Sequence, residues 1–236
     1  MNRFERWLMP FWVKTPPFAR MFYPDLLWQM PDAGPCLYLT FDDGPTPGIT
    51  PWVLEQLAHY GAKATFFCLG RQAEQYPDIL QQTLELGHSV GNHSYSHLNG
   101  WKTPLAAYMH DITNCARLVP STLFRPPYGA ITPAQVKFLL QNPQVCLQDV
   151  PPHIVMWSVV SADWNRDLPW QQCYRHVVQN ISVKPLAYSP VVVFHDSEKA
   201  FKNLKEILPR ILEHYAGLGF AFKAIPPKIR QEVVQR

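Results

Sequence analysis

The sequence predicts an α/β fold of about seven parallel strands in a single domain. Short apolar segments alternate with helical segments from residue 36 to residue 224, which is typical of parallel βαβ units. The expected strands are apolar throughout, as in a sheet whose two faces are covered by helices. A nearly closed β/α barrel and an open doubly wound sheet both fit this pattern.

The expected strands lie near residues 36–41, 64–69, 89–91, 122–124, 154–159, 191–194 and 220–224. The expected helices lie near residues 49–60, 77–86, 104–118, 132–140, 169–180 and 199–215. Gly61 and Gly87 are suited to end the first two helices, because glycine adopts the left-handed conformation common after a helix. Thr132 and Pro133 are suited to begin the fourth helix as N-cap and first helical residue.

Composition places the chain among ordinary globular proteins. Its 236 residues are 47% apolar and 17% charged, and no linker divides them. The net charge of +3 is too small to indicate nucleic-acid binding. Five cysteines without a close CxxC pair are expected to be reduced core residues, which favours a cytoplasmic location. We expect a monomer.

Residues 1–31 are aromatic and proline-rich, and we separate them as an N-terminal arm from a barrel domain over residues 32–236. The apolar stretch 7–13 is short and is interrupted by Pro10, unlike the core of a secretory signal. No stretch reaches the length of a transmembrane helix. We expect the arm to pack on the domain, and peripheral association with a membrane surface is the alternative.

The segment 37–45 organises the rest of the chain. Its apolar half predicts a buried strand, and Asp42 and Asp43 follow before Gly44 and Pro45 stop it. Two adjacent acids at a buried strand end repel each other unless a positive charge lies beside them. A metal ion would supply that charge. A solvated turn is the alternative for this segment alone.

The segment 91–97 carries His93 and His97. If His97 lies on the first turn of a helix, the i,i+4 spacing directs both imidazoles to one side. Two histidines and a carboxylate form a catalytic metal site that leaves positions open for water and substrate. The pair is a weak signal by itself and becomes stronger beside Asp42 and Asp43.

Three further motifs follow later strands. Arg125 begins a loop made rigid by two prolines and a glycine, and such a loop can aim a backbone N–H at an oxyanion. Asp163 and Trp164 follow the strand near 154–159. His195 ends the strand near 191–194, where a histidine beside an acid can act as a general acid; a structural core histidine is the alternative.

Together, these five motifs resemble the polysaccharide deacetylase family, the carbohydrate esterases related to nodulation-type chitooligosaccharide deacetylases. The resemblance covers residues 37–200, with near-complete matches at 40–45, 93–97 and 125–129. Val160 departs from the acid that often occupies the fourth motif, and Val193 from the leucine common in the fifth. The resemblance implies a deformed (β/α) barrel that binds one divalent metal, usually zinc, with cobalt, nickel or manganese as substitutes.

The resemblance also implies roles for the residues of the first three motifs. Asp43, His93 and His97 would bind the metal. Asp42 would be the general base that takes a proton from the attacking water, and Arg125 would pair with Asp42 and orient it. This division suits the chemistry, because one carboxylate cannot both bind a metal strongly and remain a good base.

By the same resemblance, the Tyr128 N–H would stabilise the oxyanion. His195 would protonate the leaving amine, and Asp163 would keep that imidazole protonated. The walls of the substrate pocket would be Trp164, Val193 and Pro126. The implied function is removal of acetyl groups from an N-acetylated carbohydrate. The alternatives are an O-acetyl carbohydrate esterase and a catalytically silent metal-binding or sugar-binding module.

Overall fold

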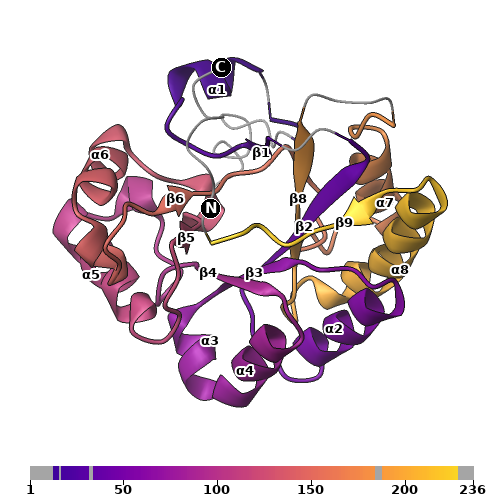
Figure 1. Ribbon diagram of the computed structural model, residues 1–236, viewed down its shortest axis with the longest axis horizontal. Coiled ribbons are helices and arrows are strands. Elements are labelled where there is room, and N and C mark those ends of the chain that lie inside the picture. Colours follow the sequence, from indigo (N-terminus) through magenta and orange to yellow (C-terminus); the bar gives the residue numbers. More distant parts are fainter. Residues whose placement is uncertain (1–12, 16, 32–33, 184–187, 228–236) are drawn as a thin grey trace.

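In a computed structural model of the protein, helices surround a curled, mainly parallel sheet (Figure 1). The structure describes residues 13–15, 17–31, 34–183 and 188–227. The first twelve residues of the expected N-terminal arm therefore lie outside the described residues. None of the helices among the described residues is long and apolar enough to cross a membrane.

The described residues form one nine-stranded sheet with the order β1-β8-β2-β3-β4-β5-β6, in which β7 also pairs with β8 and β9 with β2. Only β1 is antiparallel to its neighbour among these strands. The bounds are β1 Gln29–Met30, β2 Cys36–Asp42, β3 Thr65–Cys68, β4 Ser89–Asn92, β5 Leu123–Phe124, β6 His153–Ile154, β7 Val159–Val160, β8 Ser189–His195 and β9 Ala221–Phe222. The predicted α/β class and deformed barrel are confirmed.

The helices alternate with these strands. The α-helices are α1 Pro17–Phe22, α2 Ile49–His59, α3 Gly70–Gln75, α4 Pro77–Glu85, α5 Leu105–Ala116, α6 Pro133–Gln141, α7 Trp170–Val178 and α8 Phe201–Gly217; short 3₁₀ turns are η1 Gly100–Lys102, η2 Pro127–Gly129 and η3 Pro143–Cys146. Thr132 caps α6 in a capping box, as predicted. The prediction missed α3, a short polar helix that buries Gly70 and Ala73.

Residues 27–30 close the gap between the two ends of the parallel sheet. Leu27 N–H donates to the carbonyl of Ile154, and the N–H of Met156 donates to Leu27. Two residues further on, β1 pairs antiparallel with the start of β8 (Figure 1). This part of the expected arm is hydrogen-bonded into the barrel.

The strand expected over residues 154–159 is broken, and this detail of the prediction is wrong. It is divided into β6 and β7, with residues 155–158 between them. The carbonyls of Val155 and Met156 accept hydrogen bonds from the buried guanidinium of Arg125. Because a side chain occupies these carbonyls, they are not available to a neighbouring strand, and the ladder is interrupted there.

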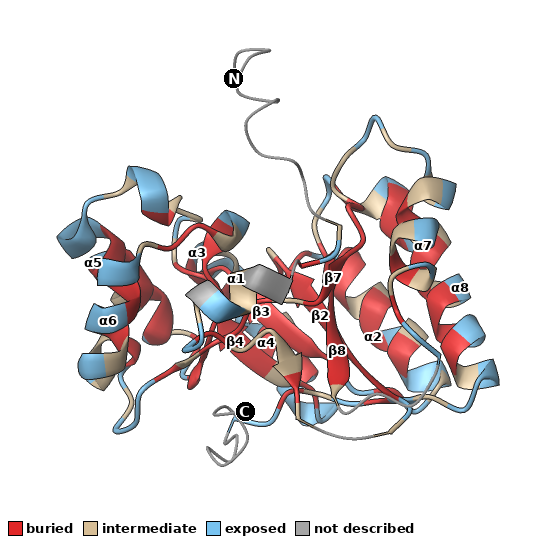
Figure 2. Cartoon of the chain, turned by 90° about the horizontal axis from the view of Figure 1, so that it is seen from above, coloured by how far each residue is buried: buried red, intermediate tan, exposed pale blue. Residues whose placement is uncertain are grey.

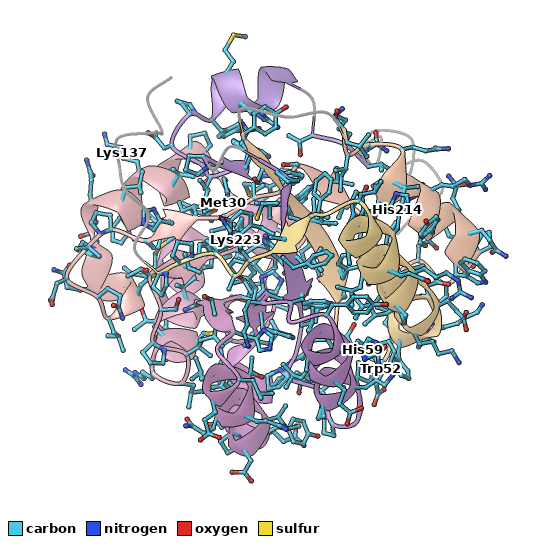
Figure 3. The ribbon with its side chains drawn as sticks, turned by 45° about the vertical axis from the view of Figure 1, so that its right-hand side comes forward. Met30, Trp52, His59, Lys137, His214 and Lys223 are labelled. Atoms are coloured by element: carbon cyan, nitrogen blue, oxygen red, sulfur yellow. The ribbon has the colours of Figure 1, made fainter. Side chains whose placement is uncertain are left out.

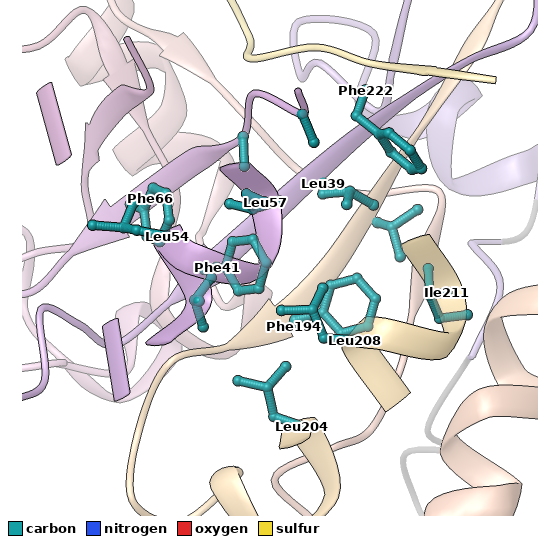
Figure 4. Packing of buried hydrophobic residues seen from close by; sticks show 14 of the residues in the cluster. Leu39, Phe41, Leu54, Leu57, Phe66, Phe194, Leu204, Leu208, Ile211 and Phe222 are labelled. Atoms are coloured by element: carbon teal, nitrogen blue, oxygen red, sulfur yellow. The ribbon is translucent and has the colours of Figure 1, made fainter. Parts of the chain in front are cut away.

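The core lies between the sheet and the helices. Phe41 stacks between Phe66 and Phe194 from the adjacent strands, with ring centroids 5.1 and 5.7 Å away. Leucine and isoleucine side chains of α2 and α8 pack against these rings (Figure 4). Figure 2 shows the consequence: the strands are buried, and exposed residues lie on the outward faces of the helices. All five cysteines are buried and free.

Candidate active site

The polar side chains selected from the sequence converge at the carboxyl ends of the parallel strands. Asp42 ends β2, and the sheet register pairs it with His195 at the end of β8. Asn92 ends β4, so that His93 begins the next loop. Ligands of open α/β sheets bind outside the carboxyl ends of the strands, so this edge is the expected place for a site.

Asp43, His93 and His97 form a compact triad whose candidate ligand atoms all lie within 4.8 Å of one another. The Asp43 Oδ1 atom lies 3.2 Å from Nε2 of His97 and 3.7 Å from Nε2 of His93. His93 Nδ1 lies 2.8 Å from the carbonyl oxygen of Arg125. A proton on Nδ1 satisfies that carbonyl and leaves the lone pair of Nε2 directed at the triad.

The electrostatics of the triad fit a cation. Oδ1 of Asp43 is buried and has no hydrogen-bond donor in the described residues. Burial lowers the pKa of His93 to about 4, so its imidazole is neutral and able to bind a metal at neutral pH. Burial opposes ionisation of Asp43, but the close imidazole of His97, together with those of His195 and His93, holds its pKa below the ordinary value. A carboxylate and two imidazoles are suitable donors for a catalytic zinc site.

The loop that carries the two histidines is not helical, and the helical placement of His97 considered from the sequence is wrong. Residues 93–99 are irregular, and both Ser94 and His97 have positive φ, 64° and 62°. Asp111 on α5 braces the loop, because its Oδ2 accepts from the N–H groups of Tyr95 and Ser96 at 3.0 Å. This bracing, rather than helical spacing, brings the imidazoles together.

Asp42 is held differently from its neighbour. Its Oδ1 accepts from Nη1 of Arg125 at 2.7 Å, and both side chains are buried, 4% and 0% exposed. Nη1 also donates to the Thr40 hydroxyl, and the guanidinium lies over the ring of Phe67 at 4.0 Å. Asp43 leaves the strand with φ 83° and joins the imidazoles. Two adjacent acids thus have separate partners.

His195 and Asp163 form a second ion pair at this edge. His195 Nδ1 lies 2.9 Å from Oδ1 of Asp163, and the backbone N–H of His195 donates to Oδ2 at 2.8 Å. Burial acts to lower the pKa of His195, but the charge and hydrogen bond of Asp163, with smaller contributions from Asp43 and Asp42, raise it to about 9. The imidazole is therefore protonated at neutral pH.

The remaining predicted residues lie around these groups. Trp164 packs edge-on against His195, with ring centroids 4.7 Å apart. Val193 is buried on β8, two residues before His195 and so on the same face of the strand. Pro126 is buried directly before the 3₁₀ turn η2. Tyr128 is 64% exposed, has φ 60°, and places its hydroxyl 3.0 Å from His97 Nδ1.

Residues 29–142 match the family model described as polysaccharide deacetylase. A peptidoglycan-N-acetylglucosamine deacetylase of Bacillus cereus is 29% identical over 209 residues, which cover 86% of this chain and 92% of the relative. The chain carries a polysaccharide deacetylase domain. The predicted family is therefore confirmed.

A solved structure and another relative extend the comparison. A crystal structure of a peptidoglycan N-acetylglucosamine deacetylase, in complex with 4-naphthalen-1-yl-N-oxidanyl-benzamide, superposes with a TM-score of 0.76 at 27% identity, covering 93% of this chain and 99% of that one. A chitooligosaccharide deacetylase of Azorhizobium caulinodans is 35% identical over 135 residues, 54% of this chain and 60% of the relative.

Sequence reasoning missed two residues that organise this candidate site. Asp111 braces the histidine loop, and its signal was an acid on the otherwise apolar buried face of α5. Asp196 is buried, and its carboxylate accepts from the N–H of Gly44 and from the hydroxyl of Thr50 at 2.5 Å. It thereby ties the loop after β2 to the end of β8. Its signal was the acid directly following His195.

Proposed function

We propose that the protein is a metal-dependent hydrolase that removes acetyl groups from an N-acetylated, amino-sugar carbohydrate. The observation that carries the proposal is the pairing of the metal-fitting triad with two separately held acid–base groups, Asp42 and His195, at one sheet edge. Amide hydrolysis requires a nucleophile, a base to deprotonate it and an acid to protonate the poor leaving group. The match to the polysaccharide deacetylase family model and to the peptidoglycan deacetylase supports the substrate class.

Asp43, His93 and His97 would hold one divalent metal, with zinc proposed and cobalt, nickel or manganese as substitutes. When bound, the metal lowers the pKa of water from ~15.7 towards ~7 and so supplies a nucleophile at neutral pH. The buried Asp43 Oδ1, which lacks a hydrogen-bond donor in the described residues, supports the assignment.

Asp42 would accept the proton of the attacking water. Arg125 holds its Oδ1 and is itself held by the hydroxyl of Thr40 and two backbone carbonyls, so the carboxylate is oriented before substrate arrives. Such preorganisation avoids reorganisation at the moment of reaction.

Tyr128 and His195 would act on the other atoms of the amide. The N–H groups of Gly129 and Ala130 are already occupied by the carbonyls of Pro126 and Pro127. We assign the N–H of Tyr128, in the same rigid turn, to the developing oxyanion. His195, kept protonated by Asp163, would give its proton to the leaving amine. Trp164, Val193 and Pro126 would enclose the acetyl methyl group.

Metal removal tests the triad. We expect a chelator to abolish acetate release from N-acetylated chitooligosaccharide and added zinc to restore it. His93→Ala should lose both metal and turnover, because a buried ligand is removed. His88→Ala is the matched control: His88 is also buried, but its Nδ1 accepts from the N–H of Ala64, the residue just before β3. It should keep metal and turnover while losing stability, and equal metal loss in both variants would contradict the assignment.

Substrate comparison tests the reaction. Acetate release would be measured from N-acetylated chitooligosaccharide, acetylated xylan and small acetyl esters, with and without zinc. Zinc-dependent release from the first substrate supports the proposal. Release from the esters alone would indicate an O-acetyl esterase, and no release by metal-loaded protein would indicate a silent binding module.

A further inference from the structure

A groove of about 360 Å³ continues from the metal triad into the loops that follow β2, β3, β7 and β8. Asp43 and His97 form part of its wall, so a substrate that reaches the triad also lies against these loops. A volume of this order is at the lower end of the range for small-ligand sites. The groove therefore has room for chemical groups beyond the acetamide of the proposed substrate.

Three cationic side chains from separate segments line this groove. Arg71 lies in the first turn of α3, Arg166 in the loop after β7 and Lys199 in the loop after β8. Apart from Asp43, which belongs to the triad, Glu198 is the only acid among the residues that line the groove. Within the described part of the chain, none of the three cations forms an ion pair. Set against the two acids Asp43 and Glu198, the three cations still leave the groove with an excess of positive charge.

Arg166 is held in a defined orientation. Its Nε donates to the carbonyl of Lys199 at 3.4 Å and its Nη2 to the carbonyl of Glu198 at 3.3 Å. These long bonds attach the guanidinium to the loop after β8 and do not neutralise its charge. A guanidinium that is already oriented loses less freedom when it binds a carboxylate or phosphate through two N–H groups.

Like charges gathered in one groove repel each other, and an anion relieves that repulsion. Building on the proposed deacetylase function, we infer that the substrate is an acidic acetylated polymer whose anionic group, a carboxylate or a phosphate ester, binds between Arg71, Arg166 and Lys199 while the acetamide lies at the triad. The cations act on a part of the substrate that does not react. They should therefore lower KM more than they raise kcat.

The test compares three N-acetylated oligosaccharides of equal length: one neutral, one with carboxylate ethers on alternate sugars and one with phosphate monoesters. We expect at least one anionic substrate to exceed the neutral one about tenfold in kcat/KM, as removal of a charge-assisted contact commonly costs. The difference in kcat/KM between the two anionic substrates shows whether the site prefers a carboxylate or a phosphate ester. The advantage should shrink in ~1 M salt, where the screening length falls to about 3 Å.

Variants assign the effect to the groove. Arg166→Gln and Lys199→Gln should each reduce the anionic-to-neutral ratio of kcat/KM. Lys137→Gln should retain the ratio, because this cation of α6 lines a different groove, beside Tyr23. Figure 3 shows Lys137 at the edge of the molecule, on the side opposite His214 of α8. A neutral substrate turned over as well as both anionic ones would overturn the inference and leave the deacetylase proposal standing.

Binding keeps the inference separate from catalysis. If metal-loaded protein released no acetate from any substrate, the deacetylase proposal would fail. Calorimetric titration of the same three oligosaccharides would then decide the anion site. Tighter binding of an anionic oligosaccharide, lost in Arg166→Gln and kept in Lys137→Gln, supports it, and equal binding of all three refutes it.

Discussion

Replacing Asp42 with asparagine separates the general base from the metal ligands. The substitution keeps the shape of the side chain and leaves an oxygen able to accept from Arg125, but it removes the carboxylate that would take a proton. The triad of Asp43, His93 and His97 is unchanged, so metal content should be retained. Loss of a positioned general base commonly costs about 10²–10⁴-fold in turnover, and we expect that range.

The same substitution has a stability cost. Arg125 is fully buried, and Asp42 is its only carboxylate partner among the described residues. An uncompensated buried charge costs about 3–5 kcal/mol. Because Arg125 keeps its bonds to Thr40 and to the carbonyls of Val155 and Met156, we expect the lower end, about 3 kcal/mol. For a domain of this size, that corresponds to a fall in Tm of roughly 6–12 °C.

The assay measures acetate release at a temperature where circular dichroism shows the variant folded, together with metal content. The Tm is measured on chelator-treated protein, so that metal binding does not contribute to the measured stability. Arg125→Met and the double variant complete a double-mutant cycle. The double variant should lose about 0.5–3 kcal/mol less stability than the sum of the losses of the two single variants. Near wild-type turnover by a fully metallated Asp42→Asn protein would refute the general-base role, and strictly additive stability losses would refute the coupling.

The remaining predictions concern His195 and Gly44. Because the folded pKa of His195, about 9, exceeds its ordinary value of 6.5, the protonated imidazole stabilises the fold fully below pH 6.5, and this contribution is lost as the pH rises through 9. Asp163→Asn should therefore destabilise the protein more at pH 6 than at pH 10 in denaturant titrations, and should move the alkaline limb of kcat towards pH 6.5 or below; an unmoved limb argues against His195 as the acid. At Gly44, an added Cβ would lie 2.1 Å from Oδ2 of Asp196, so Gly44→Ala should displace the loop, cost about 1–3 kcal/mol and weaken zinc binding. Gly48→Ala meets no atom within 4 Å and has only its φ of 72° to accommodate, at about 1–2 kcal/mol, and should leave zinc affinity unchanged; equal loss of affinity would contradict the argument.

Several features of the fold follow from local sequence alone. The strands Cys36–Asp42 and Ser189–His195 are continuous apolar runs, and a buried parallel strand requires that composition. The capping box at Thr132 is likewise a local signal. By contrast, the break between β6 and β7 depends on Arg125, thirty residues earlier, whose guanidinium occupies the carbonyls of Val155 and Met156. No local pattern in residues 154–159 records that contact.

The candidate site divides in the same way. Residue types and their order along the chain were sufficient to select Asp42, Asp43, His93 and His97, because strand ends in a parallel sheet share one edge. The sequence did not reveal that the histidine loop is irregular and braced by Asp111, since this contact joins residues fifteen and sixteen positions apart.

The sequence by itself determined the strand–helix alternation, the family and the chemical groups available at the sheet edge, because these depend on periodicity and residue type. The resemblance implied which groups pair, but tertiary structure alone decided how closely they meet: Asp42 lies 2.7 Å from Arg125 and His195 lies 2.9 Å from Asp163. It also gathered Arg71, Arg166 and Lys199 into one groove. The physical reason is that electrostatic interactions and pKa shifts depend on distance and burial in space. The paired residues Asp163 and His195 are 32 positions apart and Asp42 and Arg125 are 83 positions apart, so they meet only when the barrel closes.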